Sequence, residues 1–89
     1  KLPDNCYDNH YPCIIHGVGL CDEWPLVAYP NRDFSNADYS ANFEENMTIC
    51  VESYVGEVGG KEGIKLEDQF VVTKDGLKQL SSFPYEIDI

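Results

Sequence analysis

The sequence predicts one mainly β unit, in which an antiparallel hairpin is combined with loops and a short C-terminal element. Residues 47–56 and 63–73 each alternate apolar and polar side chains, with the two-residue period of a half-buried strand. A Gly59-Gly60 pair lies between them, as expected of a hairpin turn. The chain has 89 residues and no internal repeat or linker, so residues 1–89 are expected to form a single unit.

The charge of the chain restricts the kinds of molecule that it is expected to bind. Six basic and 16 acidic residues give a formal net charge of −10. So acidic a chain repels phosphate backbones and anionic lipids, and no apolar run reaches the about 18 residues of a membrane span. The four cysteines contain no CxxC pair and are interpreted as free thiols. These features, with an amino end that lacks an apolar signal-peptide core, predict a cytoplasmic protein that binds neither nucleic acid nor membrane.

Three strands and a long loop are expected in chain order. The first strand, residues 13–19, is rich in β-branched residues and glycine. Residues 24–46 contain prolines and asparagines that interrupt every apolar period, and are expected to be irregular. The other two strands form the hairpin, with positive φ angles at both glycines of a tight turn.

A turn centred between Gly59 and Gly60 determines which residues of the hairpin face each other. One face is then almost purely apolar and is expected to be core; it carries Met47, Ile49, Val51, Val55, Ile64, Leu66, Phe70 and Val72. On the opposite face, Glu52 lies directly across from Glu67. Like charges at about 4.5–5.5 Å destabilise a sheet, so the repulsion has to be relieved.

Three solutions are open for this pair of glutamates: a shared proton, a neutralising base such as Lys65, or a cation bound by both carboxylates. A β-bulge that shifts the register would instead separate them. A histidine beside two carboxylates is a common ligand set for Mn, Fe, Co or Zn, and His16 lies in the glycine-rich first strand. A single histidine in a strand is also commonly a hydrogen-bonded core residue.

Four linked strings resemble the C-terminal third of the pita-bread metalloenzymes, the creatinase, aminopeptidase P and prolidase family. They are HGVGL at 16–20, NMTICVE at 46–52, IKLED at 64–68 and VTKDG at 72–76. The resemblance runs from about Tyr11 to Leu80. It implies an α+β fold of which this chain is a C-terminal fragment, with the upstream strands and the N-terminal domain of the family outside it. Asn46 stands where the family often has glycine and is expected in a left-handed turn.

The family holds two metal ions with two aspartates, one histidine and two glutamates. The resemblance assigns the last three ligands to His16, Glu52 and Glu67, whereas the aspartates belong to strands upstream of this chain. It implies two divalent or trivalent transition-metal ions (Fe, Mn, Co or Zn) in a full-length parent. For this segment alone we expect weak or absent metal binding and no turnover.

The run HGVGLCDEWP at 16–25 is similar to the branch of the family that contains the dimethylsulfoniopropionate lyases. These enzymes cleave a zwitterionic sulfonium acid to dimethyl sulfide and acrylate. The similarity implies Asp22 as the general base and Tyr11 as a substrate-binding residue, whose ring would attract the sulfonium cation. Peptidases of the family carry a second histidine in this run and commonly a proline at position 53, which is Ser53 here.

The sequence therefore predicts part of a dinuclear-metal, lyase-like enzyme that performs a β-elimination on a small zwitterionic substrate. One alternative is an Xaa-Pro dipeptidase or aminopeptidase with a peptide substrate. Another is a non-catalytic remnant of the fold, in which the two glutamates share a proton or pair with Lys65. Because a fragment leaves part of its apolar face uncovered, self-association or a homodimer is also expected.

Overall fold

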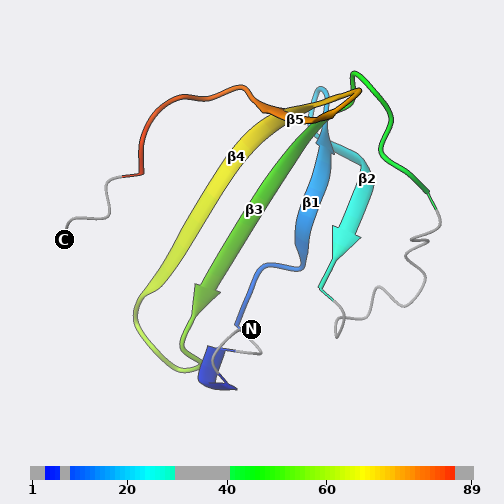
Figure 1. The fold of residues 1–89 in the computed structure, drawn as a ribbon. Helices are drawn as coiled ribbons and strands as arrows, with labels where there is room; N and C mark the ends of the chain where they lie inside the picture. The colour runs from blue at the N-terminus through cyan, green and yellow to red at the C-terminus, as the bar shows by residue number, and fades with distance from the viewer. Residues whose placement is uncertain (1–3, 7–8, 30–40, 86–89) are drawn as a thin grey trace.

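The computed structural model describes residues 4–6, 9–29 and 41–85 (Figure 1). Five strands form one antiparallel sheet in the order β2-β1-β3-β4-β5. A 3-10 turn, η1 (Asp4–Cys6), precedes β1 (Cys13–Val18), β2 (Asp22–Ala28), β3 (Thr48–Gly56), β4 (Gly63–Thr73) and β5 (Gly76–Gln79). These described parts of the chain contain no α-helix, so they show the antiparallel sheet that was predicted but not the α+β class. Accordingly, no helix in them could span a membrane.

The β3–β4 hairpin has the register that the sequence predicts. Gly56 pairs with Gly63 at one end and Thr48 with Val71 at the other, without a shift between them, and Glu52 faces Glu67. The turn is wider than expected, because the last pair of the ladder is Gly56 with Gly63. Within the loop, the Gly60 N–H donates to the Glu57 carbonyl at 2.9 Å. Of the two central glycines, only Gly59 has a positive φ, of 76°. The prediction of a tight primed turn, with positive φ angles at both glycines, is therefore wrong. The wider loop is still centred between the same two residues, and this symmetry preserves the register.

Strand β2 lies in the segment that was expected to be irregular. It pairs with β1 at the edge of the sheet, and the register shifts where His16 pairs with Leu26 and Gly17 with Glu23. Pro25 falls in this irregularity, and a residue without an N–H is tolerated at an edge or a bulge. A Cβ on Gly17 would lie 2.3 Å from the Trp24 carbonyl oxygen, so the close approach of the two strands requires glycine there. Of the rest of the expected loop, residues 30–40 lie outside the described part.

The apolar face of the hairpin is buried at one end only. Ile49 and Val72 are 1% and 8% exposed, whereas Ile64 and Leu66 are 56% and 44% exposed. The sheet carries no second layer over that half among the described residues (Figure 1). The prediction that the whole face is core is therefore only partly correct. Asn46, at the start of the hairpin, has φ of 73°, which confirms the left-handed turn expected there.

Asp68 interrupts the apolar face and holds the C-terminal segment against β4. It accepts hydrogen bonds from the Ser81 hydroxyl, at 2.7 Å, and from the Tyr85 hydroxyl. Asp68 pairs with Val51, so its side chain lies on the face opposite to Glu52 and Glu67. This carboxylate therefore binds the C-terminal segment and lies away from the pair of glutamates.

Candidate metal centre

Strands β1, β3 and β4 lie side by side and bring the three predicted ligands to one face of the sheet (Figure 1). His16 pairs with Cys50 in the β1–β3 ladder, and Glu52 follows Cys50 by one strand period, opposite Glu67. The His16 Nε2 atom is 3.3 Å from Glu52 Oε1 and 4.0 Å from Glu67 Oε1. His16 and Glu52 are only 5% and 3% exposed. Residues distant in the sequence thus converge at one point, where two of them are buried and the Glu67 side chain is 38% exposed.

Lys65 bridges the opposed glutamates and offsets one of their two negative charges. Its Nζ atom lies 2.8 Å from Glu52 Oε2 and 3.0 Å from Glu67 Oε2. Hydrogen bonds from Cys50 and then Lys65 hold the pKa of Glu67 below its usual value, which favours its charged form. The regular register excludes the separating bulge. Lys65 occupies the Oε2 atoms and leaves both Oε1 atoms directed at His16.

The orientation of His16 suits a metal ligand. Its Nδ1 atom is 2.9 Å from the Gly17 carbonyl oxygen, which can only accept a hydrogen bond, so Nδ1 carries the proton. The Nε2 atom then faces the Oε1 atoms of Glu52 and Glu67. Either a proton on Nε2 or a cation between these atoms would satisfy the nitrogen and the two carboxylate oxygens.

The donor set fits a transition-metal ion. Imidazole nitrogen and carboxylate oxygens are ligands of Mn, Fe, Co and Zn. Donors of one such ion are separated by about 3–3.5 Å when bonds are near 2.1 Å, and the distance from His16 Nε2 to Glu52 Oε1 is within this range. One face of this chain therefore offers a nitrogen and an oxygen at a distance that one ion could bridge, whereas Glu67 Oε1 lies 4.0 Å from the same nitrogen.

Two thiols at the same site were missed in the sequence. The Cys50 Sγ donates to Glu67 Oε1 at 2.8 Å, and the Cys13 Sγ donates to Glu52 Oε1 at 3.7 Å. Burial, together with the neighbouring carboxylates, raises the pKa of Cys13 to about 11 and that of Cys50 to about 12. Cys50 could have been found from the alternation of β3. Cys13 could not, because a register shift between Cys13 and Ile15 interrupts the alternation of β1.

Tyr11 and Asp22 both lie beside the cluster, on different sides. The Tyr11 N–H donates to the Tyr54 carbonyl at 3.2 Å, which extends β1 along β3 and brings the Tyr11 ring to 5.0 Å from Lys65 Nζ. Asp22 begins β2, and its Oδ1 atom is 3.6 Å from His16 Nδ1, at the ring edge away from Glu52. The Asp22 side chain is 72% exposed. An aromatic face and an accessible carboxylate therefore flank the buried ligands.

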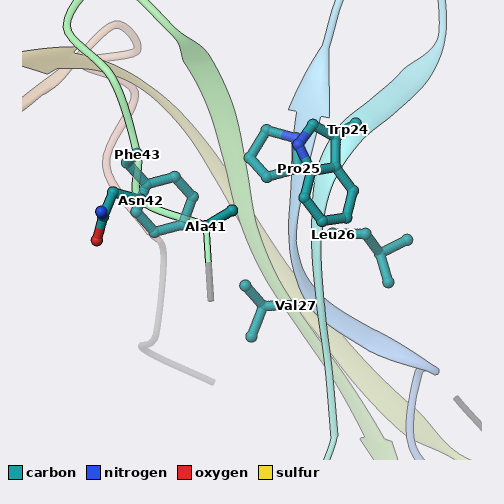
Figure 2. A pocket seen from close by; sticks show the side chains of 7 residues that line it. All are labelled: Trp24, Pro25, Leu26, Val27, Ala41, Asn42 and Phe43. Carbon is teal, nitrogen blue, oxygen red and sulfur yellow. The ribbon is translucent and has the colours of Figure 1, made fainter. Parts of the chain in front are cut away.

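A hollow of about 190 Å³ lies along β2 (Figure 2). Trp24 and Pro25 line it together with Phe43 from the segment before β3, and Leu26, Val27, Ala41 and Asn42 complete the lining. None of these described lining residues carries a titratable side chain. Trp24 is 59% exposed and lies at this edge of the sheet.

This sheet, with a histidine and two glutamates converging on one face, is what a metal-dependent hydrolase or lyase of the pita-bread type would present. Residues 5–74 match metallopeptidase family M24, and the chain belongs to this family. The predicted resemblance to the pita-bread metalloenzymes is thereby confirmed.

Individual relatives include two dimethylsulfoniopropionate lyases. The chain is 51% identical to the lyase DddP of Roseobacter denitrificans over 85% of its residues, and 46% identical to DddP of Roseovarius nubinhibens over 97%. It is 32% identical to an Xaa-Pro dipeptidase of Pyrococcus horikoshii over 91% of its residues. The chain spans only 17%, 19% and 20% of the length of these three relatives, respectively.

Proposed function

We propose that this chain supplies His16, Glu52 and Glu67 to the dinuclear metal centre of a dimethylsulfoniopropionate lyase. The observation that carries the proposal is the convergence of His16 Nε2 with the Oε1 atoms of both glutamates. The identity of 51% to a lyase, against 32% to a dipeptidase, favours elimination over peptide hydrolysis. The absence of a second histidine from the run at 16–25 supports the same choice.

In the proposed reaction, Asp22 acts as the general base. Its exposed carboxylate removes the proton from the carbon next to the substrate carboxylate, and the electron pair of that C–H bond forms the C=C bond of acrylate. The bond between the adjacent carbon and sulfur breaks, and dimethyl sulfide leaves with its electron pair. Metal ions held by the cluster would polarise the substrate carboxylate and make this proton more acidic.

Tyr11 is proposed to bind the sulfonium group. Its ring already lies 5.0 Å from the Lys65 ammonium, within the range of a cation–π contact. An aromatic face attracts a sulfonium group for the same reason that it attracts an ammonium group. Such a contact contributes roughly 0.5–2 kcal/mol, depending on how far the cation is desolvated.

A non-catalytic role is the competing interpretation, and one contact favours it. Lys65 pairs with both glutamates, so one of their two negative charges is offset without any metal ion. The free thiols of Cys13, Cys21 and Cys50 are compatible with a cytoplasmic location under either interpretation, and we include this location in the proposal.

The proposal can be tested in a chimera, because the chain spans only part of its relatives. In the Roseobacter denitrificans lyase, the matching segment is replaced by this chain, and release of dimethyl sulfide from dimethylsulfoniopropionate is measured. We expect the chimera to be active and to lose at least about 100-fold in rate when Asp22→Ala is introduced, with an unchanged metal content. Asp75→Ala, in the exposed β4–β5 turn, is the matched control and should retain full activity.

The other possible results of the chimera experiment each contradict a part of the proposal. A chimera that binds metal and hydrolyses Xaa-Pro dipeptides, but releases no dimethyl sulfide, would support the peptidase. A folded chimera without metal would support the non-catalytic remnant. Full activity in the Asp22→Ala chimera would remove Asp22 as the base while leaving the metal ligands in place.

A further inference from the structure

Cys50 holds a central position in the cluster that the proposed reaction does not use. It is the residue of β3 that pairs directly with His16, and its side chain lies on the same face as Glu52 and Glu67. Cys50 is 0% exposed. Its thiol contacts the same Oε1 atom of Glu67 that is directed at His16.

We propose that Cys50 is a sulfur ligand, so that His16, Cys50 and Glu67 bind a borderline-soft divalent ion such as Zn²⁺ or Co²⁺ through nitrogen, sulfur and oxygen. This inference rests on the proposed function, because it uses the same histidine and glutamate. The inference extends the proposed function, because it adds a thiolate to a ligand set otherwise made of nitrogen and oxygen.

The distances agree with such a site. One donor atom from each of His16, Cys50 and Glu67 lies within 4.8 Å of the other two. Tetrahedral zinc, with bonds of about 2.0–2.3 Å, separates its donors by about 3.3–3.7 Å. The distance from Cys50 Sγ to Glu67 Oε1, 2.8 Å, and that from His16 Nε2 to the same oxygen, 4.0 Å, lie just below and just above this range. The third separation, between the donor atoms of His16 and Cys50, is at most 4.8 Å, so small side-chain movements are needed to bring the three donors to one ion.

The surroundings of the three donors favour a cation there. Lys65 binds the Oε2 atoms of Glu52 and Glu67 and so does not cover the Oε1 atoms that face His16. Glu52 Oε1, 3.3 Å from His16 Nε2, provides an oxygen for a fourth position. When the ion binds, the Cys50 thiol releases its proton to solvent and the sulfur bonds to the metal. Sulfur selects Zn²⁺ and Co²⁺ over Mn²⁺ and Mg²⁺, which prefer oxygen.

The test adds Co²⁺ to the complete chain under anaerobic conditions and records the absorption spectrum. A sulfur ligand gives an intense charge-transfer band in the near ultraviolet, which nitrogen and oxygen ligands do not give. We expect this band in the unmodified chain, its loss in Cys50→Ser, and its retention in Cys21→Ser, where an exposed thiol is removed. Competition with a chromophoric chelator should show that Cys50→Ser weakens Zn²⁺ binding at least tenfold and leaves Mn²⁺ binding unchanged.

A second measurement keeps the inference testable if Cys50→Ser does not fold. In the Cys6→Ser/Cys13→Ser/Cys21→Ser variant, Cys50 is the single remaining thiol, and X-ray absorption of the Zn²⁺ form should show one sulfur at about 2.3 Å. Binding of Co²⁺ without the charge-transfer band would overturn the sulfur ligand, although the proposed nitrogen and oxygen centre would stand. A band that survives Cys50→Ser and is lost in Cys13→Ser would also overturn it. Failure of the isolated chain to bind any metal ion would overturn the sulfur ligand, whereas the proposed function, which expects only weak or absent binding by this segment alone, is tested separately in the chimera.

Discussion

The His16 Nε2 atom lies 3.3 Å from Glu52 Oε1, in a place where neither residue is more than 5% exposed. Burial of a carboxylate next to an imidazole lone pair is costly unless a cation or a proton lies between them. The Gly17 carbonyl fixes the Nδ1 proton and directs Nε2 at this carboxylate. The backbone of β1 thus determines which atom of the histidine faces the cluster.

Replacing Glu52 by Gln should weaken divalent metal binding at least about tenfold, because it removes one of the oxygens directed at His16 Nε2 together with its charge. Isothermal titration calorimetry with Zn²⁺ and Mn²⁺ measures the affinity. Glu62→Gln, in the exposed hairpin loop, is the control and should bind as the unmodified chain does. Equal affinities of the two variants would show that Glu52 is not a ligand.

Lys65→Met should destabilise the chain and make its stability depend on metal ions. The substitution leaves Glu52 and Glu67 opposed without the ammonium that bridges them, and we expect a loss of about 1–3 kcal/mol in the free energy of unfolding. Divalent ions should restore more stability to this variant than to the unmodified chain. Urea denaturation with and without Zn²⁺ provides the measurement, with Lys78→Met on β5 as the control. An unaffected midpoint would mean that the two glutamates do not repel.

Stability should fall in acid because of Glu67. The pKa of this carboxyl is lowered from its ordinary 4.5 by hydrogen bonds from Cys50 and Lys65. A group with a lower pKa in the folded state stabilises the fold above its unfolded pKa, and this contribution disappears as the pH falls through the folded pKa. Urea midpoints measured from about pH 6 to 3 should therefore decline below about 4.5, and Glu67→Gln should flatten the decline. If Glu67→Gln leaves the pH dependence of the urea midpoint unchanged, the acid sensitivity arises from other titratable groups.

The buried thiols should react slowly. With the pKa of Cys13 at about 11 and that of Cys50 at about 12, little thiolate is present at neutral pH, and both side chains are buried. Cys21 is exposed and should be alkylated by iodoacetamide first. Mass spectrometry of timed samples, with a urea-unfolded sample as the reference, identifies the modified positions. Labelling of Cys50 as rapidly as Cys21 would contradict the buried position of Cys50.

The uncovered half of the apolar face should promote association between copies of the chain. Ile64, Leu66 and Leu77 are each at least 44% exposed, and exposed apolar patches favour association. Sedimentation velocity should show a concentration-dependent increase in mass that Leu66→Glu reduces. Val58→Glu, in the hairpin loop, adds the same charge at an exposed apolar residue away from the paired strands and should have little effect. A chain that stays monomeric at high concentration would remove this expectation.

The sequence by itself determined the central hairpin. Alternation with a two-residue period and a turn centred on Gly59 and Gly60 were enough to predict every pair from Thr48↔Val71 to Gly56↔Gly63, including Glu52 opposite Glu67. These features are local, since they depend on neighbouring residues and on one short loop. The left-handed Asn46 was predictable for the same reason, because few residue types tolerate that conformation.

Only the tertiary structure decided how the charges are satisfied and which thiols join the cluster. Pairing of β1 with both β2 and β3 places His16 at Cys50, accommodates Pro25 at an edge, and brings Tyr11 to Lys65. Each of these contacts joins segments that lie far apart in the chain or depends on an irregular register. Periodicity along the sequence contains no information about such pairings, because they are fixed by which strands become neighbours and by where each ladder shifts.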